Sequence, residues 1–287
     1  MTTSVSPQAP GSIEPRSWLI TGATSGIGRA LTVAALHRGD NVAALARHTE
    51  ALDNLTATHP DRLIVVHTDV RDAETVKAAV QRAVATFGRI DVVANIAGYG
   101  LFGAIEESTD AQARAIFDTN VFGVLNVLRA ILPTLREQRG GHILQGSCHG
   151  QSAYPGAGLL AATQHAVEGL TGALAGEVKP LGIKVTLVEP GPTATSFLSN
   201  LDVATAMADY DQTVRVVQQA LSDLPASAFE SADRVAAAML AAVDAEKPPL
   251  RLATGSAGAS AIRAALNARL PDADPAVRPA HQEETLT

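Results

Sequence analysis

The turn between residues 21 and 28 has the composition of a phosphate-binding loop. It reads Thr21-Gly22-Ala23-Thr24-Ser25-Gly26-Ile27-Gly28 and stands between an apolar strand and a helical segment. Glycine at such positions lets the chain turn sharply, lets the backbone approach a pyrophosphate and lets strand and helix pack closely. The N-terminus of the helix adds free N–H groups and the positive end of its dipole. The pattern predicts a dinucleotide site that includes Thr21, Gly22, Ser25, Gly26, Ile27 and Gly28.

The residue after the second apolar strand distinguishes between the two nicotinamide dinucleotides. An acidic side chain there would bind the ribose 2′-hydroxyl of NAD and would repel a 2′-phosphate. This strand, Asn41–Ala46, ends without an acid and is followed by Arg47. A guanidinium group binds a phosphate through two parallel hydrogen bonds. We therefore expect NADP(H) as the cofactor; the alternative is that Arg47 is a solvated charge at a helix cap.

Short apolar runs alternate with helical segments along most of the chain. The strands expected from these runs are Ser17–Thr21, Asn41–Ala46, Leu63–His67, Val92–Asn95, His142–Gln145, Lys184–Glu189 and Leu250–Ala253. The helical segments are Gly28–Arg38, Asp72–Phe87, Asp110–Arg139, Leu159–Lys179 and Ala232–Ala245. Strands that are apolar throughout are typical of a sheet covered on both faces. The alternation predicts an α/β fold, a doubly wound and mostly parallel seven-stranded sheet of the Rossmann type with helices on both faces.

No linker interrupts the chain between Arg16 and Leu270, so we expect one domain over residues 16–270. Residues 1–15 and 271–287 are polar and contain proline, which indicates a flexible leader and a flexible tail. One long insertion, Thr193–Phe229, follows the sixth strand at the edge where open α/β sheets bind ligands. We expect it to be a lid over the substrate. A helical surface excursion or a contact between subunits is the alternative.

The composition excludes several classes of function. The net charge is −7, whereas proteins that bind nucleic acid usually concentrate basic charge. No run approaches the eighteen or so apolar residues of a membrane helix, and the N-terminus lacks the pattern of a secretory signal. The single cysteine, Cys148, rules out an internal disulfide framework and fits a reducing compartment. We expect a cytoplasmic protein that binds neither nucleic acid nor membrane.

The order of the motifs over residues 16–255 resembles the short-chain dehydrogenase/reductase family. The resemblance begins with the spacing of the glycines in the first turn and continues at the ends of later strands. It implies that an adenine is contacted by Asp69 and Val70, and that the segment after the fourth strand lies beside the cofactor through Asn95, Ala97 and Gly98. It also implies that Asn120 organises a water of a proton relay. The nicotinamide carboxamide would be held by Pro190, Gly191, Thr193 and Thr195.

The chain departs from this family at the residues that transfer the proton. The family has a Ser followed by Tyr-x-x-x-Lys on a helix, where Tyr donates the proton and Lys lowers its pKa. The segment His165–Leu170 fixes the register, and it places Leu160 at the Tyr position and Gln164 at the Lys position. Neither side chain can act as an acid or carry positive charge. Ser147 lies thirteen residues before Leu160, which is the family's spacing between Ser and Tyr.

Several nearby side chains are candidates to replace the missing groups. His149 titrates near neutrality, and Tyr154 stands in the same loop on the substrate side; packing of the loop is the alternative for Tyr154. Cys148 could point into the site, although a small buried residue is the simpler interpretation. Tyr99 follows Gly98 and would line the substrate pocket together with Leu160. Gln164 can still form hydrogen bonds to ribose hydroxyls, whereas His165 should be structural.

Three functions remain open at this stage. The first is reduction of an activated electrophile by NADPH, such as an iminium, an enone or a quinone-like compound, because these need less help from an acid. The second is a redox-neutral cyclase or isomerase that retains the nucleotide. The third is an NADP(H)-binding pseudoenzyme or sensor. We expect a small hydrophobic substrate, no metal, and a homodimer or homotetramer formed through the helices Asp110–Arg139 and Leu159–Lys179.

Overall fold

The central element is a seven-stranded parallel sheet with the strand order of a doubly wound fold. The computed structural model describes residues 14–147 and 152–271. The sheet runs in the order β11-β7-β6-β4-β1-β2-β3. Its strands are β1 (Ser17–Thr21), β2 (Asn41–Ala46), β3 (Leu63–His67), β4 (Val92–Asn95), β6 (Gly141–Gly146), β7 (Ile183–Pro190) and β11 (Arg251–Thr254). The strand order reverses between β1 and β4, which is where such sheets form a ligand crevice. The predicted fold class is confirmed.

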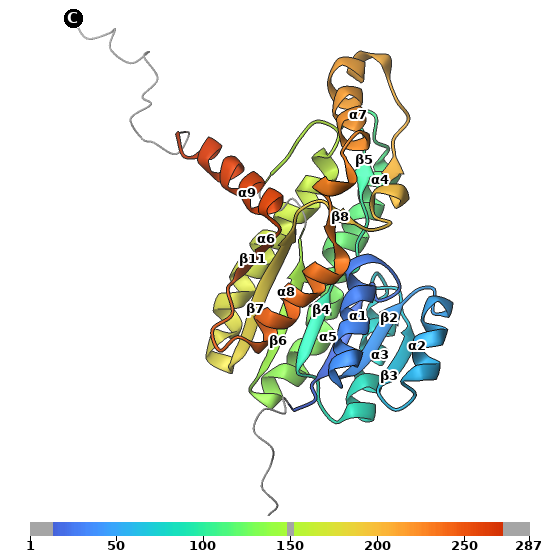
Figure 1. Ribbon diagram of the computed structural model, residues 1–287, viewed down its shortest axis with the longest axis vertical. Helices are drawn as coiled ribbons and strands as arrows, with labels where there is room; N and C mark the ends of the chain where they lie inside the picture. The colour runs from blue at the N-terminus through green and yellow to red at the C-terminus, as the bar shows by residue number, and fades with distance from the viewer. Residues whose placement is uncertain (1–13, 148–151, 272–287) are drawn as a thin grey trace, which may run out of the picture.

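Helices cover both faces of this sheet (Figure 1). On one face lie α1 (Gly26–Arg38) and α8 (Ala232–Asp244), and on the other lie α3 (Ala73–Phe87), α5 (Gly123–Gln138) and α6 (Gly158–Val178). Successive residues of β1 enter opposite layers, since Leu19 packs in the layer of α3 and α5 whereas Trp18 and Ile20 pack in the layer of α1 and α8. Burial on both faces explains why the strands are apolar throughout, as the sequence indicated.

The predicted helix Asp110–Arg139 is not one regular helix. It consists of α4 (Asp110–Phe117), a π-helical turn (Asp118–Phe122) and α5. Of the described residues, Asp110–Gln138 alone has the length and mean hydropathy of a helix that could cross a membrane. Its α5 part buries Val127, Ile131 and Leu135 against the sheet, as a core helix does. π-helical turns are frequent at functional sites, and this one contains Asn120.

Smaller elements were not anticipated from the sequence pattern. They include α2 (Asp53–Thr58) and α9 (Ser256–Arg269), together with two short parallel pairings outside the main sheet. One joins β5 (Leu101–Phe102) to β9 (Asp202–Val203), and the other joins β8 (Thr193–Ala194) to β10 (Glu230–Ser231). The segment Thr193–Phe229, called the lid from here on, also contains α7 (Val216–Ser222). The lid packs beside β5 and α4 (Figure 1).

A buried carboxylate fastens the lid to the segment that follows β5. The side chain of Glu107 accepts hydrogen bonds from the backbone N–H of Ala104 (2.7 Å), the backbone N–H of Met207 (2.8 Å) and the guanidinium of Arg215. Met207 and Arg215 belong to the lid. The Met207 N–H, followed by the Ala104 N–H and the Arg215 charge, holds the pKa of Glu107 below its ordinary value although burial acts in the opposite direction. Glu107 is therefore a fixed anion on which two parts of the lid converge.

Loss of the Glu107 charge should loosen the lid. In Glu107→Gln the amide can still accept a hydrogen bond, but the Arg215 guanidinium loses its counter-ion. We expect limited proteolysis within residues 193–229 to become about tenfold faster, because local opening is easier. Glu106→Gln is the matched control, since the Glu106 carboxylate also meets the lid, at the Tyr210 hydroxyl, but in an exposed position. Equal cleavage rates in both variants would contradict the assigned role of Glu107.

Candidate functional site

The glycine-rich turn adopts a conformation that side chains would prevent. Gly22 and Gly26 have φ values of 67° and 51°, in the left-handed region. A Cβ atom on Gly28 would overlap the carbonyl oxygen of Gly22, so α1 can approach the turn this closely only with glycine at 28. The first turn of α1 contains no acidic residue, and its N-cap, Ser25, makes no capping hydrogen bond with its side chain. The turn therefore offers its N-terminal N–H groups to an anion.

Thr21 connects this turn to the end of β4. Its Oγ1 accepts hydrogen bonds from the backbone N–H groups of Ile96 (2.9 Å) and Ala97 (3.0 Å) and donates to Oδ1 of Asn95 (3.3 Å). A Cβ on Gly22 would lie 3.1 Å from Ala97, so the two segments touch through their backbones. The structure thus brings together the predicted residues of the first turn and those that follow β4.

Asn120 connects the end of β4 to α6. It is buried in the π-helical turn, where its Oδ1 accepts from the N–H of Tyr99 (3.1 Å) and its Nδ2 donates to the carbonyl of Tyr99 (2.9 Å). Nδ2 also lies 3.3 Å from Oγ1 of Thr163, which donates to the carbonyl of Leu160. A Cβ on Gly98 would meet Asn120 at 3.1 Å. Asn120 therefore holds the segment after β4 against the helix that carries Leu160 and Gln164.

Residue 160 lies in an apolar environment. Leu160 is buried in a cluster with Leu101 and Ile116, and Tyr99 and Phe197 pack against this cluster. Gln164 follows four residues later, on the same face of α6, and is 8% exposed. Within the described residues, this face offers no acid at 160 and no positive charge at 164.

Ser147 directly follows β6 and is almost completely buried. Its backbone N–H donates to the carbonyl of Val188 (2.9 Å), but its Oγ has no hydrogen-bond partner among the described residues. A buried hydroxyl without a partner is unfavourable by about 1–3 kcal/mol, so this position favours a ligand that bonds to it. Two other predicted residues of this loop, Cys148 and His149, lie outside the described residues. His165, for which a structural role was expected, has its Nδ1 2.8 Å from the carbonyl oxygen of Ala161.

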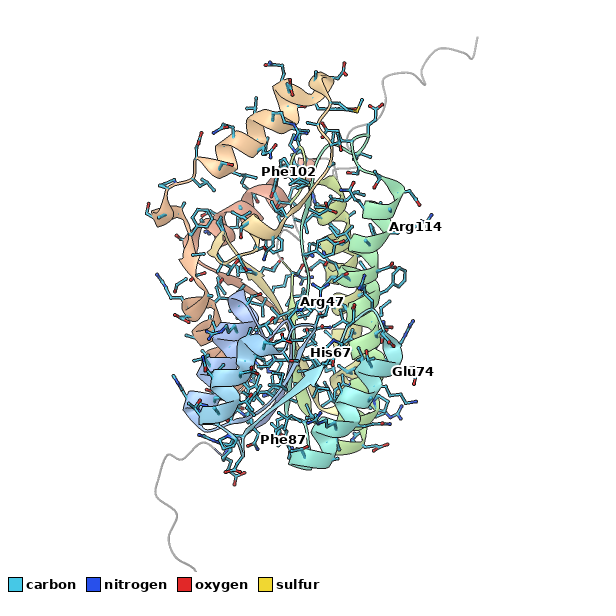
Figure 2. The ribbon with its side chains drawn as sticks, turned by 90° about the vertical axis from the view of Figure 1, so that its right-hand side faces the viewer. Arg47, His67, Glu74, Phe87, Phe102 and Arg114 are labelled. Carbon is cyan, nitrogen blue, oxygen red and sulfur yellow. The ribbon has the colours of Figure 1, made fainter. Side chains whose placement is uncertain are left out.

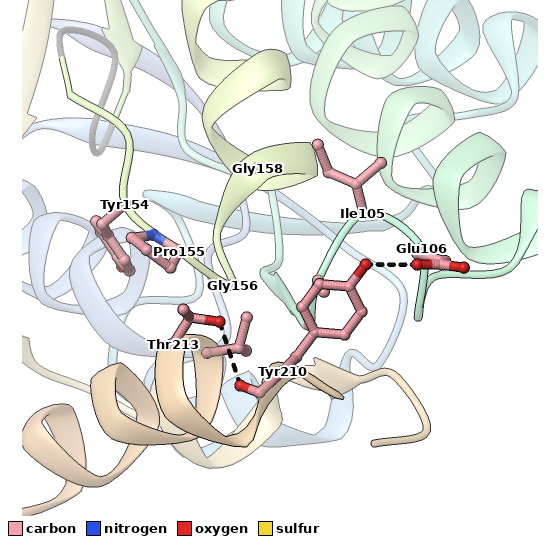
Figure 3. Close-up of a pocket in the computed structure, with 11 residues that line it drawn as sticks. Ile105, Glu106, Tyr154, Pro155, Gly156, Gly158, Tyr210 and Thr213 are labelled. Carbon is pink, nitrogen blue, oxygen red and sulfur yellow. Dashed lines mark hydrogen bonds between the residues drawn. The ribbon is translucent and has the colours of Figure 1, made fainter. Parts of the chain in front are cut away.

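Tyr154 lines a cavity of about 550 Å³ between the lid and the loop before α6 (Figure 3). The cavity wall is mostly apolar and includes Ala104, Ile105, Pro155 and Val214. Tyr210 also lines the cavity, and its hydroxyl donates to Glu106 (2.5 Å), which is shown as a dashed line in Figure 3. The described wall thus combines apolar groups with four polar side chains, those of Glu106, Tyr154, Tyr210 and Thr213.

The loop after β7 returns to the phosphate-binding turn. Gly191 contacts the backbone of Gly258 so closely that a Cβ on Gly191 would lie 2.9 Å from the Gly258 nitrogen. Thr193 Oγ1 donates to the carbonyl of Gly191 (2.9 Å), and Thr195 Oγ1 accepts from the N–H of Phe197 (3.2 Å). A Cβ on Gly26 would meet Thr195 at 3.2 Å. The loop that begins at Pro190 therefore closes over the N-terminus of α1.

The opposite end of the crevice carries charged groups. Figure 2 shows Arg47 above His67; Arg47 directly follows β2, and His67 is the last residue of β3. Arg47 is exposed, whereas Val70 is buried against α5. Asp69 bonds to the side chain and backbone of Arg71, and this pairing lowers the pKa of Asp69. Arg71 was not singled out in the sequence, although its position two residues after an acid was visible.

A second set of charged groups lies near the end of β7 and consists of Glu189, Glu168 and Arg251. Glu189 is 3% exposed and its Oε1 has no partner in the described part of the chain. Burial, together with the nearby charge of Glu168, raises the pKa of Glu189 to about 7. Glu168 itself bonds to Arg251. Sequence reasoning missed Glu189 because nothing in the strand distinguishes it from a surface residue. No group of three or more His, Cys, Asp or Glu side chains in the described residues is arranged to hold a metal.

The raised pKa of Glu189 should make stability depend on pH in a defined direction. Between its ordinary value of 4.5 and about 7, the folded protein keeps a proton that the unfolded chain has lost, so this group lowers stability as pH rises. Glu189→Gln should therefore gain in melting temperature relative to wild type by about 3 °C or more between pH 5 and pH 8. Glu177→Gln, an exposed position on α6, is the control. A difference between wild type and Glu189→Gln that does not change with pH would refute the prediction.

Comparison with known proteins assigns the chain to a family. The family model of short chain dehydrogenases matches residues 16–206. Oxidoreductase BOA17 of Botryotinia fuckeliana is 38% identical over 241 residues, which cover 83% of this chain and 88% of the relative. The crystal structure of a short-chain dehydrogenase from Streptomyces avermitilis has a TM-score of 0.84 at 37% identity and covers 90% of this chain and 95% of its own. A short chain dehydrogenase from Burkholderia cenocepacia in complex with NADP has a TM-score of 0.70 at 28% identity, covering 90% and 98%.

Proposed function

The chain belongs to the short-chain dehydrogenase/reductase family, and we propose that it is an NADP(H)-dependent reductase of activated electrophiles. The observation that carries this proposal is the apolar cluster around Leu160, at the position of the family's proton donor. A substrate that develops strong negative charge on oxygen would find no acid there. An iminium, an enone or a quinone-like compound either carries positive charge or spreads the negative charge.

The cofactor proposal rests on the two ends of the crevice. A nicotinamide dinucleotide fits the phosphate-binding turn, because the glycines at 22, 26 and 28 leave the backbone N–H groups accessible. At the other end, exposed Arg47 supports NADP(H) over NAD, since a guanidinium favours a 2′-phosphate. The NADP complex of the Burkholderia relative is consistent with this choice.

The described residues around Leu160 would bind and orient the substrate and the cofactor. Bound NADPH would supply a hydride to the electrophilic carbon; this converts an iminium to an amine directly, whereas the anion formed from an enone or a quinone-like compound would take its proton from solvent. Ser147 would donate one neutral hydrogen bond to a heteroatom of the substrate, because its buried Oγ lacks a partner within the described residues. Gln164 would hold the ribose hydroxyls, and Asn120 would keep the segment after β4 in place. The apolar wall around Leu160 would exclude water from the reacting carbon.

The cavity beside the lid supports a small hydrophobic substrate. Its described wall is mostly apolar, and its Glu106 and Tyr210 side chains bond to each other. An anionic substituent would find no cationic side chain in this described wall and would lose its hydration. We therefore propose that the part of the substrate remote from the reacting carbon is apolar and carries no negative charge.

A homodimer or homotetramer formed through α4, α5 and α6 stays a prediction, as does a cytoplasmic location. Two features of the described surface are compatible with packing between subunits. Phe122 is 53% exposed, and a Cβ on Gly169, Gly172 or Gly176 of α6 would meet nothing within 4 Å. Small residues on an exposed helix face allow close approach of a second helix.

Restoring the family's proton donor should extend the reaction to simple ketones. Wild type should oxidise NADPH in the presence of cyclic iminium or enone substrates, with little activity toward cyclohexanone. Leu160→Tyr combined with Gln164→Lys should raise ketone reduction by about 10²–10⁴-fold, the usual contribution of a positioned acid. Absorbance at 340 nm measures both reactions. Conversion of the iminium or enone without NADPH oxidation would instead indicate a redox-neutral enzyme, and absence of NADPH binding would remove the proposal.

Filling the cavity should weaken binding of the substrate without changing that of the cofactor. Thr213 lines the cavity from the lid, and Thr213→Trp would place a large ring in it. We expect KM for a bulky apolar enone to rise about tenfold, with the dissociation constant of NADPH unchanged. Gln212→Trp is the matched control, because residue 212 is exposed on the same turn and does not line the cavity. Unchanged KM in Thr213→Trp would place the substrate elsewhere.

A further inference from the structure

Arg71 presents an unused part of its guanidinium at the carboxyl edge of the sheet. Its Nε lies 3.0 Å from both carboxylate oxygens of Asp69, and its Nη2 lies 2.5 Å from Oδ2. Among the described residues, Nη1 has no hydrogen-bond partner, and the side chain is 48% exposed. A guanidinium has five N–H donors, so several remain available after the contact with Asp69.

The loop that carries Arg71 is fixed before any ligand arrives. Nδ2 of Asn126, on α5, donates to the carbonyls of Val70 (3.0 Å) and Arg71 (3.2 Å). The backbone N–H of Arg71 donates to Asp69 Oδ1 (3.0 Å), and Thr75 Oγ1 donates to the carbonyl of Asp69 (3.2 Å). A guanidinium anchored in this way loses little conformational freedom when it binds an anion.

Arg47 and Arg71 follow neighbouring strands, at the same edge of the sheet. The positive charge of Arg47 acts on Asp69 in the same direction as that of Arg71, and both cations act on the phenol of Tyr99. Asp69 and exposed Asp118 are the carboxylates whose charges reach Arg71. Strands β2 and β3, which precede the two arginines, are neighbours with Ala46 opposite His67. Two guanidinium groups from adjacent strand ends therefore lie on the same rim, and one of them neutralises the nearest acid.

We propose that Arg71, oriented by Asp69, is a second binding group for the 2′-phosphate of NADP(H) beside Arg47. The inference rests on the proposed cofactor and deepens it. The pairing with Arg71 has two effects on a phosphate at this rim. It removes the repulsion that an unpaired Asp69 carboxylate would exert, and it supplies donors from a side chain that is already positioned. A phosphate dianion matches two guanidinium groups in charge and in hydrogen-bonding geometry.

The test compares two nucleotides that differ by the 2′-phosphate and lack nicotinamide. Adenosine 2′,5′-bisphosphate and 5′-AMP are titrated into the full-length protein and its variants by calorimetry. Arg71→Gln should weaken binding of the bisphosphate by about ten- to a hundredfold, the range expected for a hydrogen bond to a charged group. The dissociation constant of 5′-AMP should change by less than about twofold. Arg71→Lys keeps the positive charge but not the planar set of guanidinium donors. Its affinity for the bisphosphate should therefore fall less than that of Arg71→Gln. Arg89→Gln is the matched control, because Arg89 bonds to Asp91 two residues away, before β4.

The results distinguish failure of the role proposed for Arg71 from failure of the proposed preference for NADP(H). Equal weakening of both nucleotides in Arg71→Gln would mean that Arg71 contacts the adenine, and no weakening of either would mean that it only neutralises Asp69. Each of these results overturns the inference. If wild type binds the bisphosphate no better than 5′-AMP, both the inference and the preference for NADP(H) fail. If wild type prefers the bisphosphate and only Arg47→Gln abolishes that preference, the preference stands and the inference fails. Thermal unfolding of each variant verifies that it is folded.

Discussion

The geometry of the whole crevice depends on one hydroxyl group. Thr21 Oγ1 accepts two backbone hydrogen bonds from the segment after β4, and these are the N–H groups that the ends of parallel strands leave unpaired. Without that acceptor, two N–H groups at a partly buried position would lack partners. These two hydrogen bonds fix the distance between the segments that follow β1 and β4, at the point where the strand order reverses. The glycine turn can then contact the backbone of Ala97, and the crevice has a defined width.

Asn120 connects the segment after β4 to α6 by hydrogen bonds, as Thr21 connects the first turn to that segment. The side chains that α6 presents at this contact then determine the chemistry. The backbone around residues 98–99 is held as it would be for a proton relay, yet the face of α6 that it meets carries Leu160. Among the described residues, position 160 of this face therefore carries an apolar side chain where such a relay would need an acid. Farther along this face Glu168 pairs with Arg251. The positive charge near this carboxylate therefore comes from β11 rather than from α6.

The strands could be predicted more closely than the elements between them. β1 to β4 have the predicted bounds, because an apolar run between polar turns leaves a strand covered on both faces little freedom in its ends. The run Asp110–Arg139 has continuous helical periodicity, so its π-helical turn could not be predicted from the pattern. That turn coincides with the bonds from Asn120 to the backbone of Tyr99, which are tertiary. The two-residue strands β5 and β9 likewise exist only through pairing across about a hundred residues.

Whether a site residue could be predicted from the sequence depends on how far along the chain its partners lie. Motifs of fixed spacing identified the turn, the ends of β4 and β7, and the register of α6. Glu107 could not be found, because its role comes from Arg215, 108 residues away. Arg71 is different, since its partner Asp69 is two residues away and Arg47 follows the neighbouring strand. An acid shortly after one strand, an arginine two residues later and a second arginine directly after the neighbouring strand are a signal that a sequence alone can supply. Its meaning depends on the parallel order of β2 and β3, which was also predictable.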